Sequence, residues 1–245
     1  MSAGSLGVIT GTGFTDVTAL ENPQLQEIVT AFGTVEAVVG ELHGRRTVFL
    51  PRHRRDHSVP PHLVNYRALI QALVDQGVTE VLAVNVVGGI GPETGQLVVV
   101  DDFIDYTKSR ISSFFDGAPP DGVVHVDVTE PYDSRLRSTW IEAAGQLGLD
   151  VIPHGIYGAF EGPRFETAAE IRMARAAGVT VVGMTGVPEV VLAMERGLPY
   201  ASLCLVVNPA AGLGPPVSVD AIVEQITLSA ETVQGVIAEA ARMLS

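Results

Sequence analysis

The 245-residue sequence has one cysteine, few basic residues and no long apolar run. Cys204 alone cannot form an intrachain disulfide, as is typical of a reducing cytoplasm, and its apolar surroundings favour a buried structural thiol over a nucleophile. A net charge of −13 provides no basic footprint for nucleic acid. No apolar stretch approaches membrane-spanning length, and the first residues lack the basic and apolar regions of a signal peptide. We therefore expect a cytoplasmic protein whose partners are neither nucleic acids nor membranes.

Several common enzyme motifs are also missing. The histidines form no His-Glu-x-x-His pair and have no cysteine partner at zinc spacing, so no metal is expected. There is no Gly-x-Ser-x-Gly elbow and no phosphate-loop lysine. The glycine loop Thr10-Gly11-Thr12-Gly13 has Asp16 where a dinucleotide loop needs its third glycine. This difference argues against a dinucleotide-dependent oxidoreductase.

The composition and its patterning predict one α/β domain over residues 1–245. Hydrophobic residues make up 47% of the chain and charged residues 18%, enough for a sizeable core. Helical patterns start near residues 62, 134, 167, 188 and 218, and Thr167 and Glu170 form a capping box. They alternate with short β-branched runs at 7–10, 47–50, 81–87, 97–100, 151–156, 179–184 and 201–207. This order predicts a central mixed sheet with helices on both faces and a ligand site at the carboxyl ends of its strands.

Three segments at the ends of predicted strands could bind an anion. Residues 52–57, with the sequence Arg-His-Arg-Arg-Asp-His, concentrate cationic groups in an acidic chain. The guanidinium of Arg52 suits a phosphate and His53 could donate to a further oxygen, which favours an oxyanion site over a solvated basic loop. Thr12 in the glycine loop could add a hydroxyl donor, although an ordinary tight turn explains that loop equally well. Thr185, before a helix that carries Pro188 in its first turn, is another donor, and alone it is better explained as a plain N-cap.

Other residues after predicted strands suit a flat heterocyclic base. Phe165 could stack on the base and Glu166 could accept N–H bonds, but a core phenylalanine and a first-turn acid explain them at least as well. Asn208 can both donate and accept, yet an Asn before Pro also favours a turn, and residues 209–216 could form a lid. Met184 offers an apolar surface, and the double glycine after Asn85-Val86-Val87 would let backbone approach a ligand.

Together these elements resemble one family, the trimeric purine nucleoside phosphorylases and methylthioadenosine phosphorylases. The resemblance runs from Gly7 to about Met243. Six segments carry it: Gly11-Thr12-Gly13, Arg52-His53, Val64-Asn65-Tyr66, Gly88-Gly89, Glu161-Gly162-Pro163-Arg164-Phe165 and Met184-Thr185-Gly186-Val187-Pro188-Glu189.

The resemblance implies a role for individual residues and a homotrimer. Inorganic phosphate would be a co-substrate, with no cofactor, and would be bound by Thr12, Arg52, His53, Thr185 and the backbone near Val86. Met184 would line the ribose pocket and Phe165 would face the base. His125 would complete the site of the neighbouring subunit near the 5′ group.

Three positions depart from the adenine-specific members of that family. Those members carry Asp where this chain has Asn208, a second Asp where it has Ala210, and no acid at the position of Glu166. An amide can donate to O6 and N7 of a 6-oxopurine, and Glu166 can accept from N1–H, whereas adenine would leave buried polar groups unpaired. The combination resembles methylthioinosine phosphorylases, with inosine and guanosine phosphorylases close behind.

The expected reaction is phosphorolysis of a purine nucleoside, with Asn208, Glu166 and His53 taking part in catalysis. Three alternatives stay open. Methylthioadenosine phosphorylases share the framework, and a hydrolytic nucleosidase shares the broad fold but needs no phosphate clamp. A non-catalytic nucleoside-binding protein needs no such clamp either, which disfavours it.

Overall fold

Buried strands with apolar side chains on both faces form the centre of the molecule. In the computed structural model, which describes residues 4–14, 19–118 and 122–245, Asp16 of the glycine loop lies outside the described residues. The described strands form one mixed sheet: β1 (Ser5–Thr10), β2 (Glu21–Thr30), β3 (Gly33–Leu42), β4 (Arg45–Pro51), β5 (Val78–Gly89), β6 (Leu97–Val99), β7 (Asp102–Asp105), β8 (Val151–Ile152), β9 (Ile156–Ala159), β10 (Val181–Gly183) and β11 (Tyr200–Pro209).

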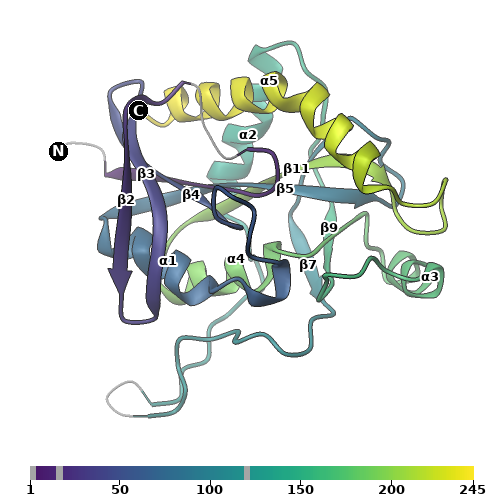
Figure 1. Ribbon diagram of the computed structural model, residues 1–245, viewed down its shortest axis with the longest axis horizontal. Helices are drawn as coiled ribbons and strands as arrows, with labels where there is room; N and C mark the ends of the chain where they lie inside the picture. The colour runs from purple at the N-terminus through teal and green to yellow at the C-terminus, as the bar shows by residue number, and fades with distance from the viewer. Residues whose placement is uncertain (1–3, 15–18, 119–121) are drawn as a thin grey trace.

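Helices cover both faces of this sheet, as the sequence predicts (Figure 1). They are α1 (Tyr66–Asp75), α2 (Ser134–Gln146), α3 (Ala168–Ala176), α4 (Gly186–Glu195) and α5 (Val219–Met243). One core cluster joins the sheet to α1 and α4, and a second joins its other face to α2 and α5. Successive residues of β11 point to opposite faces of the sheet. Leu203 and Leu205 belong to the cluster with α2 and α5, and Cys204 belongs to the cluster with α1 and α4. The fold is therefore a single-domain α/β fold. Cys204 is fully buried, as expected of a structural thiol, and burial raises the pKa of the thiol to about 12.

Four parallel strands end at the same edge of the sheet. Strand β1 pairs with both β4 and β5, and β5 pairs in turn with β11, all in parallel. In this register Thr10 lies beside Pro51, and Gly88 lies beside Asn208. The segments that follow these strands therefore meet at one place although they are far apart in the sequence, as expected for ligand sites of open α/β sheets.

Most predicted elements are confirmed, with three differences. The run at 151–156 is two short strands, β8 and β9, that pair with different neighbours. Helix α1 begins at Tyr66 because residues 61–63 form a 3-10 turn and the Asn65 side chain caps the helix by accepting from the Ala68 N–H. Strands β2, β3 and β7 were not predicted; β2 is an exposed edge strand with a largely polar sequence, so it lacks the apolar signal of a buried strand.

The other helix signals match the structure. The capping box of Thr167 and Glu170 is formed at the start of α3. Pro188 lies in the first turn of α4, after a non-helical Val187. Among the described residues, no helix has both the length and the apolar character needed to cross a bilayer.

Candidate active site

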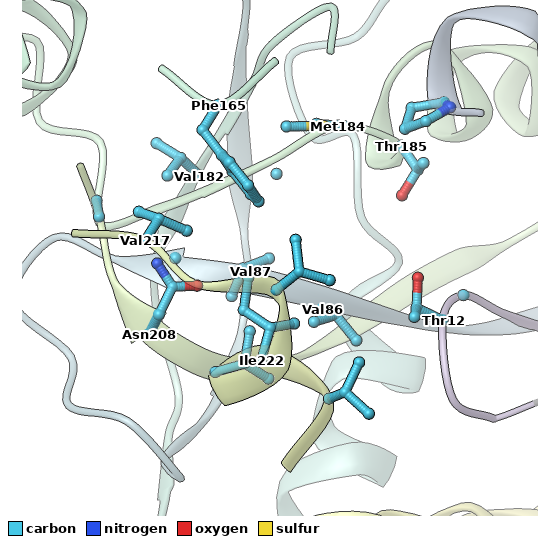
Figure 2. Close-up of a pocket in the computed structure, with 18 of the residues that line it drawn as sticks. Thr12, Val86, Val87, Phe165, Val182, Met184, Thr185, Asn208, Val217 and Ile222 are labelled. Carbon is cyan, nitrogen blue, oxygen red and sulfur yellow. The ribbon is translucent and has the colours of Figure 1, made fainter. Parts of the chain in front are cut away.

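The edge where the parallel strands end contains a cavity of about 250 Å³ (Figure 2). All expected site residues except His125 line it: Thr12, Arg52, His53, Val86, Phe165, Glu166, Met184, Thr185 and Asn208. In Figure 2 the hydroxyl groups of Thr12 and Thr185 lie on one side, and Phe165 and Asn208 lie on the other. The cavity thus has two chemically different ends, which we call the hydroxyl end and the amide end.

A buried ion pair fixes Arg52 at the hydroxyl end. The Nε and Nη2 atoms of Arg52 donate to the two carboxylate oxygens of Glu189 at 2.6 and 2.8 Å, and both side chains are fully buried. Tyr200 donates to the same carboxylate at 2.7 Å. Burial alone would lower the pKa of Arg52, but the Glu189 carboxylate more than offsets this effect and raises it. The guanidinium is therefore charged and held in one orientation.

The glycine loop lets this guanidinium approach the cavity. A Cβ atom on Gly11 would lie 3.2 Å from Nη1 of Arg52, closer than most side-chain contacts. Nη1 also donates to the Val84 carbonyl at 3.2 Å. Gly11 therefore matters here for close packing against Arg52, a role distinct from the tight turn considered from the sequence.

A side-chain network positions Thr185. The Thr185 hydroxyl donates to Oδ1 of Asn85 at 2.9 Å, and the Asn85 amide donates to the hydroxyl of Ser202 at 2.7 Å. The backbone N–H groups of Thr185 and Gly186 both point to the phenol oxygen of Tyr157, each at 3.2 Å. Thr185 precedes α4 without capping it through its side chain, so the plain N-cap considered from the sequence is not what forms.

His53 is a neutral imidazole. Its Nδ1–H donates to the Val59 carbonyl at 2.8 Å. Burial, together with the charge of Arg52 nearby, lowers the pKa of His53 to about 4. At neutral pH its Nε2 atom therefore carries a lone pair, and the donor role expected of His53 would require it to take up a proton.

Glu166 and Phe165 belong to the loop before α3, at the amide end. Burial raises the pKa of the Glu166 carboxyl, and the carboxylate of Glu170 adds to the effect. Phe165 is 40% exposed, so its ring is open to a ligand rather than enclosed in the core. Gly162, with φ of 66°, allows this loop to approach Met184, because a Cβ atom there would lie 2.6 Å from the methionine sulfur.

Asn208 offers one donor and one acceptor to the cavity. Its Nδ2 atom donates one hydrogen to the Pro209 carbonyl at 2.7 Å. The second N–H and the carboxamide oxygen are left for a ligand, and Figure 2 shows the oxygen turned towards the cavity. The amide therefore has one N–H for a base, where the sequence led us to expect two.

The beginning of α5 adds an apolar wall that the sequence did not reveal. Val219, Ile222 and Val223 line the cavity together with Val217 of the preceding loop. Val219 and Val223 are 62% and 50% exposed, so a substantial apolar surface is uncovered there. The periodicity of α5 predicts Ile222 as part of its apolar stripe, whereas Val219 and Val223 carried no separate signal.

Two buried polar residues were also overlooked, although both stand in the quoted motifs. Glu189 is the one charged residue among the seven buried residues of α4, and the other six are apolar or glycine. A lone carboxyl group in such a run signals a buried partner. Asn85 similarly interrupts the apolar β5. Within the described parts of the chain, no three His, Cys, Asp or Glu side chains gather to form a metal site.

His125 lies away from the cavity. It is exposed on the loop between β7 and α2, which protrudes from the body of the molecule in Figure 1. The residue is thus separate from the site of its own chain.

Comparison with known proteins adds a family and several relatives. The model of the phosphorylase superfamily matches residues 5–242. A probable 6-oxopurine nucleoside phosphorylase of Moorella thermoacetica is 43% identical, with 96% of this chain and 91% of that protein covered. A probable S-methyl-5′-thioinosine phosphorylase of Xanthomonas campestris is 48% identical, with 86% and 85% covered. Methylthioadenosine phosphorylase from Schistosoma mansoni in complex with adenine superposes with a TM-score of 0.92 at 33% identity, covering 98% of this chain and 91% of that one.

The buried pair gives a prediction for Glu189→Gln. The variant leaves the Arg52 charge uncompensated, so we expect its free energy of unfolding to fall by about 3 kcal/mol or more. Added phosphate should then raise the melting temperature of the variant more than that of the unmodified protein, because an anion in the cavity would compensate Arg52.

Glu80→Gln is the matched control, because Glu80 forms a buried pair with Arg45 that does not line the cavity. It should lose stability without the additional response to phosphate. Equal phosphate responses of the two variants in thermal unfolding would contradict the assignment.

His53 gives a prediction for the pH dependence of stability. Its pKa is about 4 in the folded protein and 6.5 is its ordinary value, so between these values the unfolded chain binds more protons. Stability is therefore present above pH 6.5 and is lost as the pH falls towards 4, by about 2 kcal/mol between pH 7 and pH 5. Denaturant unfolding without phosphate should show this loss, and His53→Gln should show a loss smaller by that amount. Parallel pH curves for the two proteins would rule out a buried neutral His53.

Proposed function

The chain belongs to the phosphorylase superfamily, and from this premise we propose that it cleaves 6-oxopurine nucleosides with inorganic phosphate. The products are the free base and a ribose 1-phosphate, and S-methyl-5′-thioinosine is the preferred substrate. One observation carries the proposal: a single cavity holds Arg52, Thr12 and Thr185 at one end and Glu166 with Asn208 at the other. The relatives named above as 6-oxopurine nucleoside and S-methyl-5′-thioinosine phosphorylases support it.

Base selection rests on the polar atoms of the amide end. A 6-oxopurine has an N1–H donor and an O6 acceptor, whereas adenine has a bare N1 and an amino group. Glu166 accepts from N1–H, and the free N–H of Asn208 donates to O6. Adenine reverses both partners and leaves them unpaired in a partly buried site, which makes methylthioadenosine a poorer substrate.

The reaction breaks the C1′–N9 bond and forms a bond between C1′ and a phosphate oxygen. The electron pair of the broken bond passes to the purine, and N7 of the departing base takes up a proton from solvent water. The carboxamide oxygen of Asn208 accepts from N7–H while its amide holds O6, so the developing charge is stabilised. Arg52, fixed by Glu189, aligns phosphate with the sugar and makes the attack effectively intramolecular.

The apolar wall favours a methylthio group at the 5′ position. Val219, Ile222 and Val223 offer no hydrogen-bonding side chain to a 5′ hydroxyl group. A thioether placed against them buries apolar surface, which is favourable by about 0.8 kcal/mol per methylene-sized group. Inosine and guanosine are then slower substrates of the same site.

The proposal includes a cytoplasmic homotrimer in which residues 1–245 act as one domain, without a cofactor. The protruding loop supports assembly, because Ile111 and Val123 on it are 61% and 74% exposed, a state that contact with another subunit would relieve. His125 on the same loop would approach the 5′ end of a neighbouring site. The phosphate oxygen is itself the nucleophile, so the proposed reaction does not need a protein nucleophile.

A panel of five nucleosides tests the function: adenosine, inosine, guanosine, methylthioadenosine and methylthioinosine, each with and without phosphate. We expect base release only with phosphate, 6-oxopurines ahead of their adenine counterparts, and methylthioinosine ahead of inosine. Release at the same rate without phosphate would instead identify a hydrolytic nucleosidase. Tight binding of nucleosides without any turnover would identify a binding protein.

Asn208→Asp tests the base selection. The carboxyl group cannot offer the amide hydrogen to O6, so kcat/KM for methylthioinosine should fall by about 100-fold while that for methylthioadenosine rises. Asn208→Ala should lower both rates without the shift towards adenine. The assignment of Asn208 to the base fails if neither variant alters turnover of inosine and methylthioinosine.

A further inference from the structure

A second imidazole lies at the hydroxyl end of the cavity, that of the last residue in the cationic segment 52–57. His57 lines the cavity, and its Nε2 atom lies 3.4 Å from Oγ1 of Thr12. The rings of His53 and His57 are neighbours, with centroids 4.9 Å apart and planes tilted by 58°. Five residues after Arg52, the chain has returned to the same site.

The backbone conformation of residues 52–57 brings His57 back to the cavity. Arg54 and His57 adopt left-handed conformations, with φ of 64° and 56°, which are unfavourable for residues with a Cβ atom. Two turn hydrogen bonds hold the loop, from the Arg54 N–H to the Pro51 carbonyl and from the His57 N–H to the Arg54 carbonyl. The loop therefore has a defined shape that directs His57 back towards Thr12.

The other candidate donors at this end already use hydrogens within the protein. Arg52 gives Nε–H and one Nη2 hydrogen to Glu189 and an Nη1 hydrogen to Val84. The Thr185 hydroxyl gives its hydrogen to Asn85 and is left with lone pairs. Its bonds to Glu189 and Val84 leave Arg52 with two N–H groups, and the nearby carboxylate of Glu189 offsets part of its attraction for an anion.

His53 and the start of α4 do not make up this deficit. The Nδ1–H of His53 is bound to Val59, so the neutral ring presents an acceptor to the cavity. The backbone N–H groups of Thr185 and Gly186 are bound to Tyr157. A bound phosphate has several acceptor oxygens. Fewer hydrogen-bond donors are free for them than the number of polar side chains at this end suggests.

We propose that His57 binds the phosphate co-substrate by donating from Nε2, beside the hydroxyl of Thr12. This inference rests on the proposed function and adds a phosphate-binding residue to it. The Nε2 atom of His57 and the hydroxyl of Thr12 lie 3.4 Å apart on the same cavity, so both can turn to one ligand oxygen. His57 then supplies the donor that His53 lacks while its ring is neutral.

The test uses His57→Leu, which removes the donor, and His57→Gln, which keeps an amide N–H. His43→Asn is the matched control, since His43 is exposed on the turn between β3 and β4 and also has a left-handed backbone. Loss of a hydrogen bond to a charged group should raise KM for phosphate about 10-fold or more in His57→Leu. KM for the nucleoside should stay near its original value, His57→Gln should be intermediate, and His43→Asn unchanged.

A direct measurement covers the case in which a variant folds poorly. In the unmodified protein with labelled histidine, the ring nitrogen resonances of His57 should shift on addition of inorganic phosphate and not of chloride at equal ionic strength. The inference is overturned if His57→Leu leaves KM for phosphate unchanged or raises both KM values equally. It is also overturned if the His57 resonances do not shift when phosphate is added. An unmodified enzyme that releases base without phosphate would instead overturn the proposed function itself.

Discussion

The buried pair between Arg52 and Glu189 is the constraint on which the site depends. A charged guanidinium without a partner could not be enclosed at the end of β4, because an isolated buried charge is strongly disfavoured. Glu189 supplies that partner from the first turns of α4, and Tyr200 of β11 orients the carboxylate. The interactions of this carboxylate thus join two strands and a helix at the cavity, and they fix the guanidinium that we propose binds phosphate.

The polar groups of the cavity are of two kinds: some are already hydrogen-bonded within the protein, and others are free for a ligand. At the hydroxyl end, Thr185 and His53 are tied to protein atoms and leave acceptors facing inward. At the amide end, Asn208 keeps one donor and one acceptor for a ligand. Apolar side chains of α5 also line the cavity. This arrangement suits a neutral heterocycle joined to a sugar, with an anion held at the far side by a small number of well-placed donors.

The sequence predicted the fold class and nearly all of the candidate site because strong local signals coincided with a simple topological rule. Polar motifs followed the apolar runs, and parallel strands bring such segments to one edge. Hydrogen-bond direction could not be predicted in the same way, since the partners of His53 and Asn208 are a backbone carbonyl in each case. The roles of Glu189 and of the apolar wall of α5 depend on tertiary contacts, so the sequence did not predict them. Strand β2 was not predicted because an exposed edge strand has no apolar pattern.

The central claim is that one cavity holds an inorganic oxyanion and a 6-oxopurine at the same time, on opposite sides of the sugar position. A crystal structure of the protein soaked with sulfate and hypoxanthine tests it most directly. The account predicts sulfate within hydrogen-bonding distance of Arg52 and Thr12, and hypoxanthine against Glu166 and Asn208 in the same cavity. Sulfate and base in separate cavities, or hypoxanthine bound away from Asn208, would contradict it.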